Sequence, residues 1–420
     1  MNERLLQFIW QFQYFNKQEL HTVGGEPVQV LHPGLLNSNQ GPDFQQASVK
    51  IGTTVLVGTA ELHLQTSDWL KHQHDGDANY KNVVLHIVWQ HNTTIHAHIP
   101  VLELHNRVSK IMLQQYQQWM NNPQLVPCAG TINGVKELVW LNWKERLLAE
   151  RLERKAAYAL QLLQHNNQHW EETFWQLLAR NFGIKINAEA FEAIAKSVPV
   201  TVLAKHKNQL PVLEALLLGQ AGLLQGDFTE EYPKLLQREY QFYQAKYQLQ
   251  PLNQPVHFLR MRPASFPTVR LAQLAALVYD ASHLFSKIKE AATVTALIKL
   301  LNVTANDYWH YHYLLEEATD YKPKKLGRQM VVTIIVNTIV PVVFAYGLLH
   351  RNESMKEKAL RWLQQLPAEK NNITQGWQQL GIANQHALDS QALIELKTQY
   401  CSKKRCLDCG VGNALLKMVQ

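Results

Sequence analysis

Residues 41–69 read GPDFQQASVKIGTTVLVGTAELHLQTSDW, and this stretch decides the fold of the first part of the chain. The runs QASVKIG and TVLVGTAELHL are separated by a Gly-Thr turn, a pattern that predicts two antiparallel strands joined in a hairpin. Counting back from the turn places Asp43 opposite roughly residue 62. The hairpin therefore predicts that Asp43 lies close to Glu61 and His63.

The second predicted strand has two different faces, because side chains two residues apart in a strand point the same way. One face is apolar and suits the core: Leu56, Ala60, Leu62 and Leu64. The other face ends in a carboxylate and an imidazole: Val57, Thr59, Glu61 and His63. This pattern favours a site at the end of the hairpin over a plain structural strand.

Asp43 and Glu61 together offer the oxygen ligands that Mg²⁺ or Mn²⁺ prefers. His63 adds an imidazole that can bind a metal or act as a general acid or base. The sequence therefore predicts Asp43 and Glu61 as ligands of a divalent ion, and Asp43, Glu61 and His63 as catalytic residues. A salt-bridged or turn-capping role for the two acids is the alternative.

The chain changes character near residue 110. A helix is predicted over residues 2–15, followed by short strand-like runs with Gly, Pro, Asn and Asp between them. Beyond residue 110, apolar residues recur at three- and four-residue intervals, which predicts helices. The expected class is α+β: a small mixed α/β domain (1–110), restriction-endonuclease-like in type, a mostly helical body (111–395) and a cysteine-bearing tail (396–420).

The helices of the body are predicted from this periodicity. They cover 135–164, 170–182, 211–224, 232–246, 268–286, 291–301, 330–350 and 355–365. The run 330–349 is the one candidate for a membrane span, but polar residues and a proline interrupt it, so a buried helix is expected. We expect no membrane association.

Composition predicts a folded, cytoplasmic protein. The chain has 420 residues, of which 46% are hydrophobic and 18% charged. The first residues, MNERLLQFIWQFQYF, lack the pattern of a signal peptide. With four cysteines and no export signal, disulfides are not expected. The oligomeric state is left open.

The positive charge is concentrated outside the first domain. Residues 1–110 hold seven Lys and Arg against nine Asp and Glu, a net charge of −2. Because the whole chain has a net charge of +7, the remaining residues carry +9. A basic surface there would suit DNA or RNA. The residues predicted as candidate phosphate contacts are Arg260, Arg262, Arg270, Lys324 and Lys325. Ion pairs within the protein are the alternative role.

The four cysteines form a second candidate site. Cys401, Cys406 and Cys409 have the spacing C-x4-C-x2-C, and Cys128 is the remaining cysteine. Thiolates at these spacings can bind Zn²⁺ or an iron–sulfur cluster. The sequence predicts a structural metal site with Cys128 as the fourth ligand. Reduced cysteines in a buried cluster are the alternative.

The order Asp43, hairpin, Glu61-Leu62-His63 resembles the signature of the PD-(D/E)xK nuclease superfamily. In that superfamily the Asp and the Glu bind the catalytic metal and a Lys two residues after the Glu assists the attacking water. Here His63 stands in place of the Lys. The resemblance also implies an acidic residue from the first helix or nearby, for which the candidates are Glu3, Glu19 and Glu26.

Over its whole length the chain is identified as a member of an uncharacterised bacterial domain-of-unknown-function family. The segments that carry this resemblance are GPDF, ELHLQTSDWLKHQHDGDANYKNVVLHIVW, RPASFPTVRLAQLAAL and CSKKRCLDCGVG. That family implies domain boundaries but no activity.

The sequence thus predicts a metal-dependent, nuclease-like protein that hydrolyses phosphodiester bonds in nucleic acid. One alternative is a nucleic-acid-binding or scaffold protein that keeps the fold without the chemistry. Another is a hydrolase or lyase acting on a small anionic substrate at the same site. No GxxxxGK[ST], GxGxxG or GxSxG motif occurs, so nucleotide hydrolysis, dinucleotide chemistry and esterase chemistry have no support.

Overall fold

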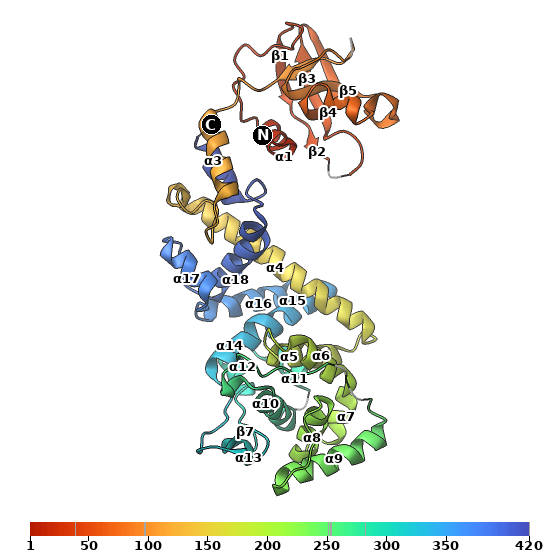
Figure 1. Ribbon diagram of the computed structural model, residues 1–420, viewed down its shortest axis with the longest axis vertical. Helices are drawn as coiled ribbons and strands as arrows, with labels where there is room; N and C mark the ends of the chain where they lie inside the picture. The colour runs from red at the N-terminus through yellow and green to blue at the C-terminus, as the bar shows by residue number, and fades with distance from the viewer. Residues whose placement is uncertain (38, 96–97, 251, 253, 282, 420) are drawn as a thin grey trace. The chain divides into compact units, whose positions relative to one another are not determined.

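The computed structural model describes the chain except residues 38, 96–97, 251, 253, 282 and 420. It confirms the predicted α+β class, with a sheet in the first part of the chain and helices in most of the remainder (Figure 1). The chain divides into two compact units: unit 1 comprises 1–145, 375–382 and 393–420, and unit 2 comprises 146–374 and 383–392. The predicted domain division at residues 110 and 395 remains a prediction.

Unit 1 contains a six-stranded mixed sheet. Its strands, in spatial order, are β1 (Val28–His32), β3 (Phe44–Ile51), β4 (Thr54–Gln65), β5 (Val83–Gln90) and β6 (Val101–Glu103), and β2 (Leu35–Leu36) also pairs with β3. β1, β3 and β4 are antiparallel neighbours, whereas β5 and β6 run parallel to β4. The last strand-like run before residue 110 includes β6, and His96 and Ala97 lie outside the described residues.

The predicted hairpin is confirmed as β3 and β4, with one irregularity. A β-bulge includes Gln46, whose φ is 58°, and beyond it Phe44 pairs with Ala60. The bulge inserts one extra residue into β3. As a result Asp43 lies beside Glu61, one position earlier than the count from the turn predicts.

Helix α1 (Glu3–Gln11) is amphipathic and packs against β4. Its N-terminus is capped by Asn2, whose side-chain oxygen accepts a hydrogen bond from the backbone N–H of Leu5 (2.8 Å). The apolar face is buried: Leu5, Leu6, Phe8, Ile9 and Trp10. The helix is shorter than the predicted 2–15, because Gln13 has a φ of 56° and interrupts the helical geometry.

The first and last segments of the chain meet within unit 1. Arg4 Nη2 lies 2.5 Å from Asp408 Oδ2, and the hydroxyl of Tyr14 donates to Asn413 Oδ1 (2.6 Å). Asn413 belongs to α19 (Gly410–Lys417), which also contacts α3 (Lys110–Asn121). Unit 1 is therefore built from residues that are far apart in the sequence.

Unit 2 is helical. Its helices are α5 (Trp170–Phe182), α6 (Ala188–Ser197), α7 (Val200–Lys205), α8 (Leu210–Gln220), α9 (Glu231–Tyr247), α10 (Pro267–Asp280), α11 (Leu284–Glu290), α12 (Val294–Leu300), α13 (Asp307–His310), α14 (Arg328–Ile334), α15 (Val340–Leu349) and α16 (Glu353–Gln365). A small hairpin joins β7 (His312–Leu314) and β8 (Glu317–Ala318). Three helices have residues in both units: α4 (Glu137–His165), α17 (Asn372–Gln379) and α18 (Ala387–Glu395).

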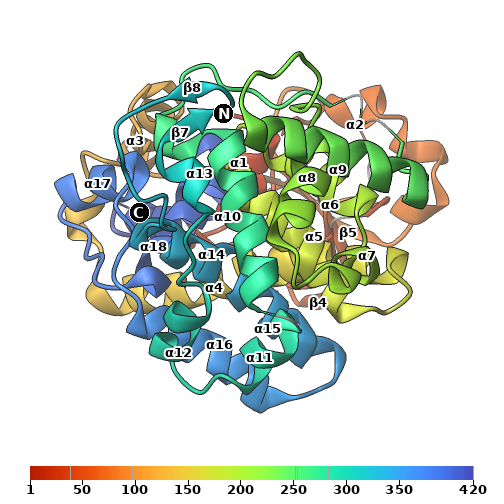
Figure 2. The same ribbon diagram turned by 90° about the horizontal axis from the view of Figure 1, so that it is seen from below.

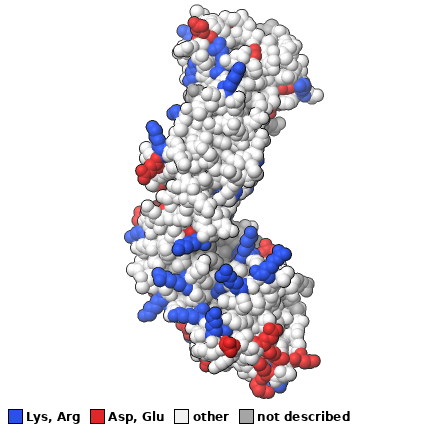
Figure 3. Space-filling view, turned by 60° about the vertical axis from the view of Figure 1, so that its left-hand side comes forward, with Lys and Arg blue, Asp and Glu red and all other residues white. Residues whose placement is uncertain are grey.

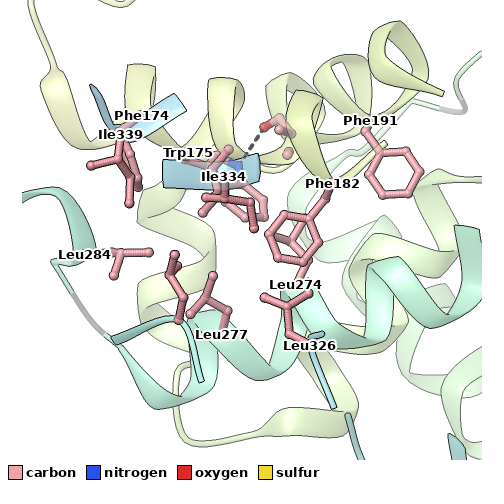
Figure 4. Close-up of a cluster of buried hydrophobic side chains, with 14 of the residues drawn as sticks. Phe174, Trp175, Phe182, Phe191, Leu274, Leu277, Leu284, Leu326, Ile334 and Ile339 are labelled. Atoms are coloured by element: carbon pink, nitrogen blue, oxygen red, sulfur yellow. Dashed lines mark hydrogen bonds between the residues drawn. The ribbon is translucent and has the colours of Figure 1, made fainter. Parts of the chain in front are cut away.

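The core of unit 2 lies between α5, α10 and the segment that begins at α14. Figure 4 labels the large side chains that meet there, among them Phe174, Phe182, Leu274, Leu277, Ile334 and Ile339. α8 contacts both α9 and α10, and Figure 2 draws these three helices side by side. Trp175 is buried with its Nε1–H donating to the carbonyl oxygens of Ala195 and Val198, both at 3.1 Å. Burying each large apolar side chain contributes about 1.5–3 kcal/mol to stability.

The long apolar segment is a helix interrupted by a wider turn. α14 passes through a π-helical turn at Ile335–Ile339 into α15. Pro341 has no N–H to donate to the carbonyl of Asn337, which accounts for the local change of hydrogen bonding. By length and composition Arg328–Leu349 could cross a membrane. In the structure, 67% of its apolar 18-residue stretch is buried.

Candidate metal centre

Asp43 and Glu61 are direct neighbours at the end of the hairpin. The backbone N–H of Asp43 donates to Glu61 Oε2 (3.0 Å), and the backbone N–H of Leu62 donates to Asp43 Oδ2 (3.1 Å). Gln7 of α1 donates from Nε2 to Asp43 Oδ1 (2.8 Å). The predicted proximity of the two acids is confirmed, while their role as metal ligands remains a prediction.

The second oxygen of Glu61 faces a group of histidines. Glu61 Oε1 lies 3.6 Å from His63 Nε2 and 3.5 Å from His74 Nε2. His63 Nε2 lies 3.1 Å from His72 Nδ1, and one nitrogen from each of these three histidines falls within 4.8 Å of the other two. A tetrahedral ion with bonds of about 2.0–2.1 Å holds its ligand atoms about 3.3 Å apart. The three nitrogens form one group near this spacing, and Glu61 Oε1 lies close to those of His63 and His74.

Strand pairing and a short helical connection bring these histidines together. His63 is on β4, whereas His72 ends α2 (Asp68–Lys71) and His74 begins the following 3-10 turn. The ring of His74 stacks on Tyr80, with ring centres 3.8 Å apart. The ring of Trp69 of α2 packs edge-on against the rings of His63 and His74, with ring centres 6.3 and 5.3 Å apart. The ligand set is thus held by aromatic packing on two sides.

His86 orients the central imidazole. It lies on β5 opposite Glu61 of β4, and its Nε2 is 2.9 Å from His63 Nδ1. When His63 turns the lone pair of Nε2 toward a cation, its Nδ1 carries the proton and donates it to His86. A hydrogen bond of this kind fixes the orientation and tautomer of a metal-binding histidine.

The His86→Leu substitution should therefore weaken metal binding without removing a ligand. We expect the dissociation constant for Zn²⁺ or Mn²⁺ to rise by about 10–100-fold, the usual effect of losing such a partner. Isothermal titration calorimetry on the full-length protein measures it, with the exposed His105→Leu variant as control. Equal affinity in both variants would contradict the orienting role of His86.

The interior of the site disfavours charge while no cation is present. Burial, followed by the charge of the neighbouring Asp43, raises the pKa of Glu61 to about 8. Burial also raises the pKa of Asp43 to about 6, against the hydrogen bonds from Leu62 and Gln7. Burial and the adjacent His86, His72 and His74 lower the pKa of His63 to about 3. His63 is consequently a neutral imidazole, the form that binds metals.

Helix α1 supplies the nearby third acid. After burial and the closer groups, the charge of Glu3 raises the pKa of both Asp43 and Glu61. Glu3 is half-buried, whereas Glu19 and Glu26 are exposed. Of the three acids that the sequence left open, Glu3 is the one with an electrostatic effect on the site.

The site opens to solvent on one side. Glu61, His63 and His74 are buried, but Asp43 is half-buried and His72 exposed. A hollow of about 370 Å³ adjoins this side and is lined by Gln40, Gly41, Pro42, Gln45, Gln46, Val57, Gly58, Thr59, Asn79 and Asn82. Its lining side chains are neutral, and its Gly41-Pro42 edge leads directly into Asp43.

The four cysteines are all buried and free of disulfides. They all belong to unit 1, where the thiol of Cys401 interacts electrostatically with those of Cys128, Cys406 and Cys409. The structure thus brings together the residues predicted as a second metal site. Whether they bind a metal remains a prediction, which the last Results section develops.

The predicted phosphate-contacting residues lie in unit 2 and differ in exposure. Arg260, Arg262 and Lys325 are exposed. Lys324 is buried, and its Nζ donates to the carbonyl oxygens of His310 (3.3 Å) and Lys322 (3.1 Å). Lys324 therefore directs its charge into the protein and not toward a phosphate.

Arg270 is also engaged within unit 2. It donates to Gln273 Oε1 (3.0 Å) and Ser265 Oγ (3.3 Å), and burial lowers its pKa to about 10. On the face drawn in Figure 3, Lys and Arg side chains gather in one region and Asp and Glu side chains in another. Charge on this face is clustered, although the figure assigns it no partner.

The histidines at positions 72, 74 and 86 were not predicted as site residues. His86 lies in an apolar strand, a pattern typical of a core histidine, and it is buried. His72 and His74 lie in a polar loop whose path the sequence does not determine. The available signal was histidine density, since eight of the 19 histidines fall within residues 63–105.

A comparison with known families identifies the chain. Residues 3–372 match the family described as "Protein of unknown function (DUF2851)". The chain belongs to the DUF2851 family. The match includes the sheet, the histidine group and Cys128 of this DUF2851 protein, and ends before Cys401. No curated protein and no solved structure shows significant similarity to it. The family carries no assigned activity, so the resemblance to the PD-(D/E)xK superfamily depends on the motif alone.

Proposed function

We propose that this protein is a metal-dependent phosphodiesterase acting on DNA or RNA, with its divalent ion held by Glu61, His63, His72 and His74. The observation that carries the proposal is a group of three imidazole nitrogens within 4.8 Å of one another, with Glu61 Oε1 3.6 and 3.5 Å from the nitrogens of His63 and His74. These atoms come from a strand, a helix end and a turn. Such convergence suits a cation better than a solvated polar surface.

The ligand set favours a transition metal. Imidazole nitrogens suit Zn²⁺ and related ions, and Mg²⁺ prefers sites made of oxygen atoms. Of the two ions predicted from the sequence, Mg²⁺ and Mn²⁺, we therefore propose Mn²⁺, and we add Zn²⁺ as the ion that the bond geometry fits. The ion would supply polarisation of a phosphoryl oxygen and a lowered pKa for a bound water.

The protein residues would divide the remaining tasks. His63 is 1% exposed and contacts two other imidazoles, so we assign it to holding the ion in place of its predicted role in deprotonating water. Asp43 is half-buried at the open side, and its pKa of about 6 leaves it ionised at neutral pH. Asp43 can therefore accept a proton from an attacking water, as a general base.

Two further features support nucleic acid as the substrate class. The hairpin with Asp43 and Glu61, and Glu3 on the first helix, correspond to the acidic positions that the PD-(D/E)xK resemblance implies. The chain has a net charge of +7, which favours binding to a polyanion. The neutral hollow beside Asp43 offers space for sugar or base groups next to the site.

The proposal predicts hydrolysis that depends on both the ion and Asp43. We expect the full-length protein to cleave single- or double-stranded DNA or RNA with Mn²⁺ or Zn²⁺ and to lose activity with EDTA. Asp43→Asn should lower the rate by about 100-fold or more, as expected for loss of a general base. Gel assays and the chromogenic diester bis(p-nitrophenyl) phosphate measure the rates.

The matched control is Asp227→Asn, which changes an exposed aspartate of unit 2 and should leave the rate unchanged. Cleavage that survives in Asp43→Asn would remove Asp43 from the reaction. If the protein bound the metal but cleaved no diester, the proposed phosphodiesterase activity would be refuted. If salt-sensitive nucleic-acid binding remained, the scaffold alternative would be favoured.

A further inference from the structure

Four cysteine side chains converge in unit 1 at a place separate from the histidine group. Cys128 follows α3 in the loop before the 3-10 turn Ile132–Gly134, Cys401 begins the turn Cys401–Lys403, and Cys409 caps α19. Each of the four, Cys406 included, is between 7% and 9% exposed. Three of these thiols come from the last segment of the chain and the fourth from a distant loop.

Backbone contacts bring the last segment and that loop together. α19 packs against α3 and against the turn Ile132–Gly134, and Met418 Sδ would lie 3.8 Å from a Cβ at Gly134. The hydroxyl of Ser109 donates to the carbonyl of Val419 (2.7 Å). Burial raises the pKa of the Cys128 thiol to about 12, and the next causes are Cys409 and Cys406. The segment that carries Cys401, Cys406 and Cys409 therefore packs against the part of the chain that carries Cys128.

The chain folds tightly around the sulfurs and requires glycine to do so. A Cβ at Gly412 would lie 2.2 Å from the carbonyl oxygen of Cys406, and one at Gly410 would lie 2.8 Å from the ring of Trp143. The backbone N–H of Cys409 donates to Cys406 O (3.3 Å). A loop this compact holds Cys406 and Cys409 at one centre.

Burial raises the pKa of all four thiols, while a few nearby groups act in the opposite direction and favour the thiolate, the form in which cysteine binds metals. The backbone N–H groups of Gly412 and Val411, at the start of α19, donate to the sulfur of Cys409. Lys397 acts on Cys401 and Lys404 acts on Cys406, each in the direction that favours the charged sulfur. Without a metal, four buried thiols have no evident use for these donors and cations.

The spacing of the sulfurs distinguishes two kinds of centre. A single tetrahedral Zn²⁺ with bonds of about 2.3 Å holds four sulfurs about 3.8 Å apart. Among the described residues, the group whose ligand atoms lie within 4.8 Å of one another is His63, His72 and His74, and no three of the cysteine sulfurs come that close. An iron–sulfur cluster shares its four cysteine ligands among two or four irons, so it does not bring three of the sulfurs to one metal ion.

We propose that Cys128, Cys401, Cys406 and Cys409 bind an iron–sulfur cluster that fastens the last segment of the chain to the loop after α3. The C-x4-C-x2-C spacing is one that iron–sulfur proteins use. The cluster is structural, since its ligands are buried and it lies apart from the proposed hydrolytic residues. This proposal does not depend on the proposed phosphodiesterase activity.

Metal analysis of the full-length protein tests this proposal. After anaerobic purification we expect about two or four iron per chain with an equal amount of acid-labile sulfide, and a brown colour. Cys128→Ser should lose most of the iron, although this residue is far in sequence from the other three. The exposed Ser402→Ala is the control and should keep its iron. One zinc per chain with no iron, or protein free of both metals, would overturn the cluster.

A second measurement covers the case in which the cysteine variants do not fold. In the native wild-type protein all four thiols should resist alkylation, and oxidative loss of the iron should make them reactive together. Limited proteolysis should then cut the segment after residue 400 at least tenfold faster. Alkylation of the iron-loaded protein at any of the four cysteines would contradict the assignment of that residue.

Discussion

Glu61→Gln is expected to abolish high-affinity binding of Mn²⁺ or Zn²⁺ and to lower phosphodiester hydrolysis by more than about 100-fold. Glu61 is the one anion among the four proposed ligands, so its replacement removes both a bond and the charge that offsets the cation. The amide of glutamine keeps the shape of the side chain. Calorimetric titration and the diester assay on the same full-length preparation measure the two losses.

In the metal-free protein, the same substitution should change how stability depends on pH. Because the pKa of Glu61 is raised to about 8 in the folded protein, its contribution to stability is present below its ordinary value of 4.5 and is lost as pH rises through 8. Glutamine cannot ionise, so Glu61→Gln should become relatively more stable as pH rises from 5 to 8. Thermal unfolding in EDTA measures this trend, with the exposed Glu26→Gln as control.

A purely structural Glu61 gives the opposite pattern. If Glu61 served only to accept the hydrogen bond from Asp43, the variant would be destabilised at every pH. Its metal binding would then fall only to the extent that folding is lost. Unchanged affinity in a folded Glu61→Gln protein would exclude the proposed ligand set.

Metal affinity should also increase strongly with pH. The proton on Glu61 must leave before a cation binds, and its pKa is about 8, while the neighbouring Asp43 has a pKa of about 6. We therefore expect affinity to rise by about tenfold per pH unit between pH 6 and 8, more steeply below 6, and to level off above 8. The gain between pH 6 and 8 is then about 100-fold.

Proton release provides a direct check. Calorimetry in buffers of different ionisation enthalpy should record close to one proton released per ion near pH 7. His63 should add nothing in this range, because its pKa is lowered to about 3. A pH-independent affinity, or a midpoint that remains in Glu61→Gln, would contradict the assignment of the titrating group to Glu61.

The sequence predicts the parts of the fold whose signals are local. The helix expected over residues 170–182 has the same bounds in α5, because its apolar residues follow one periodic face. The hairpin was predicted from its turn, and only the bulge at Gln46 was missed. Helices α17 and α18 were not predicted, because they are short and depend on tertiary contacts such as Trp377 Nε1–H donating to Leu393 O (3.1 Å).

In the candidate site too, the sequence predicts the residues that are brought together locally and misses those that are brought together by tertiary contacts. Asp43 and Glu61 could be paired by counting along a hairpin, since the register of two strands is a local property. The histidines at 72 and 74 could not be placed, because a polar loop has no periodicity that fixes its path. His86 depends on the parallel pairing of β4 with β5, which joins strands across an intervening connection. Cys128 meets the other three cysteines through packing between segments far apart in the sequence.

The assembly of unit 1 from separated segments has a consequence for how the protein is made. The strands of the sheet are complete by Glu103, but residues 393–420 of the same unit are synthesised after most of unit 2. At a synthesis rate of about 5–20 residues per second, the other three cysteines are made tens of seconds after Cys128. Unit 2 is nearly continuous and can fold in that interval. The proposed cluster could thus be inserted only after Cys409 has been synthesised, and a nascent chain arrested between Cys128 and Cys401 would carry a lone thiol open to oxidation.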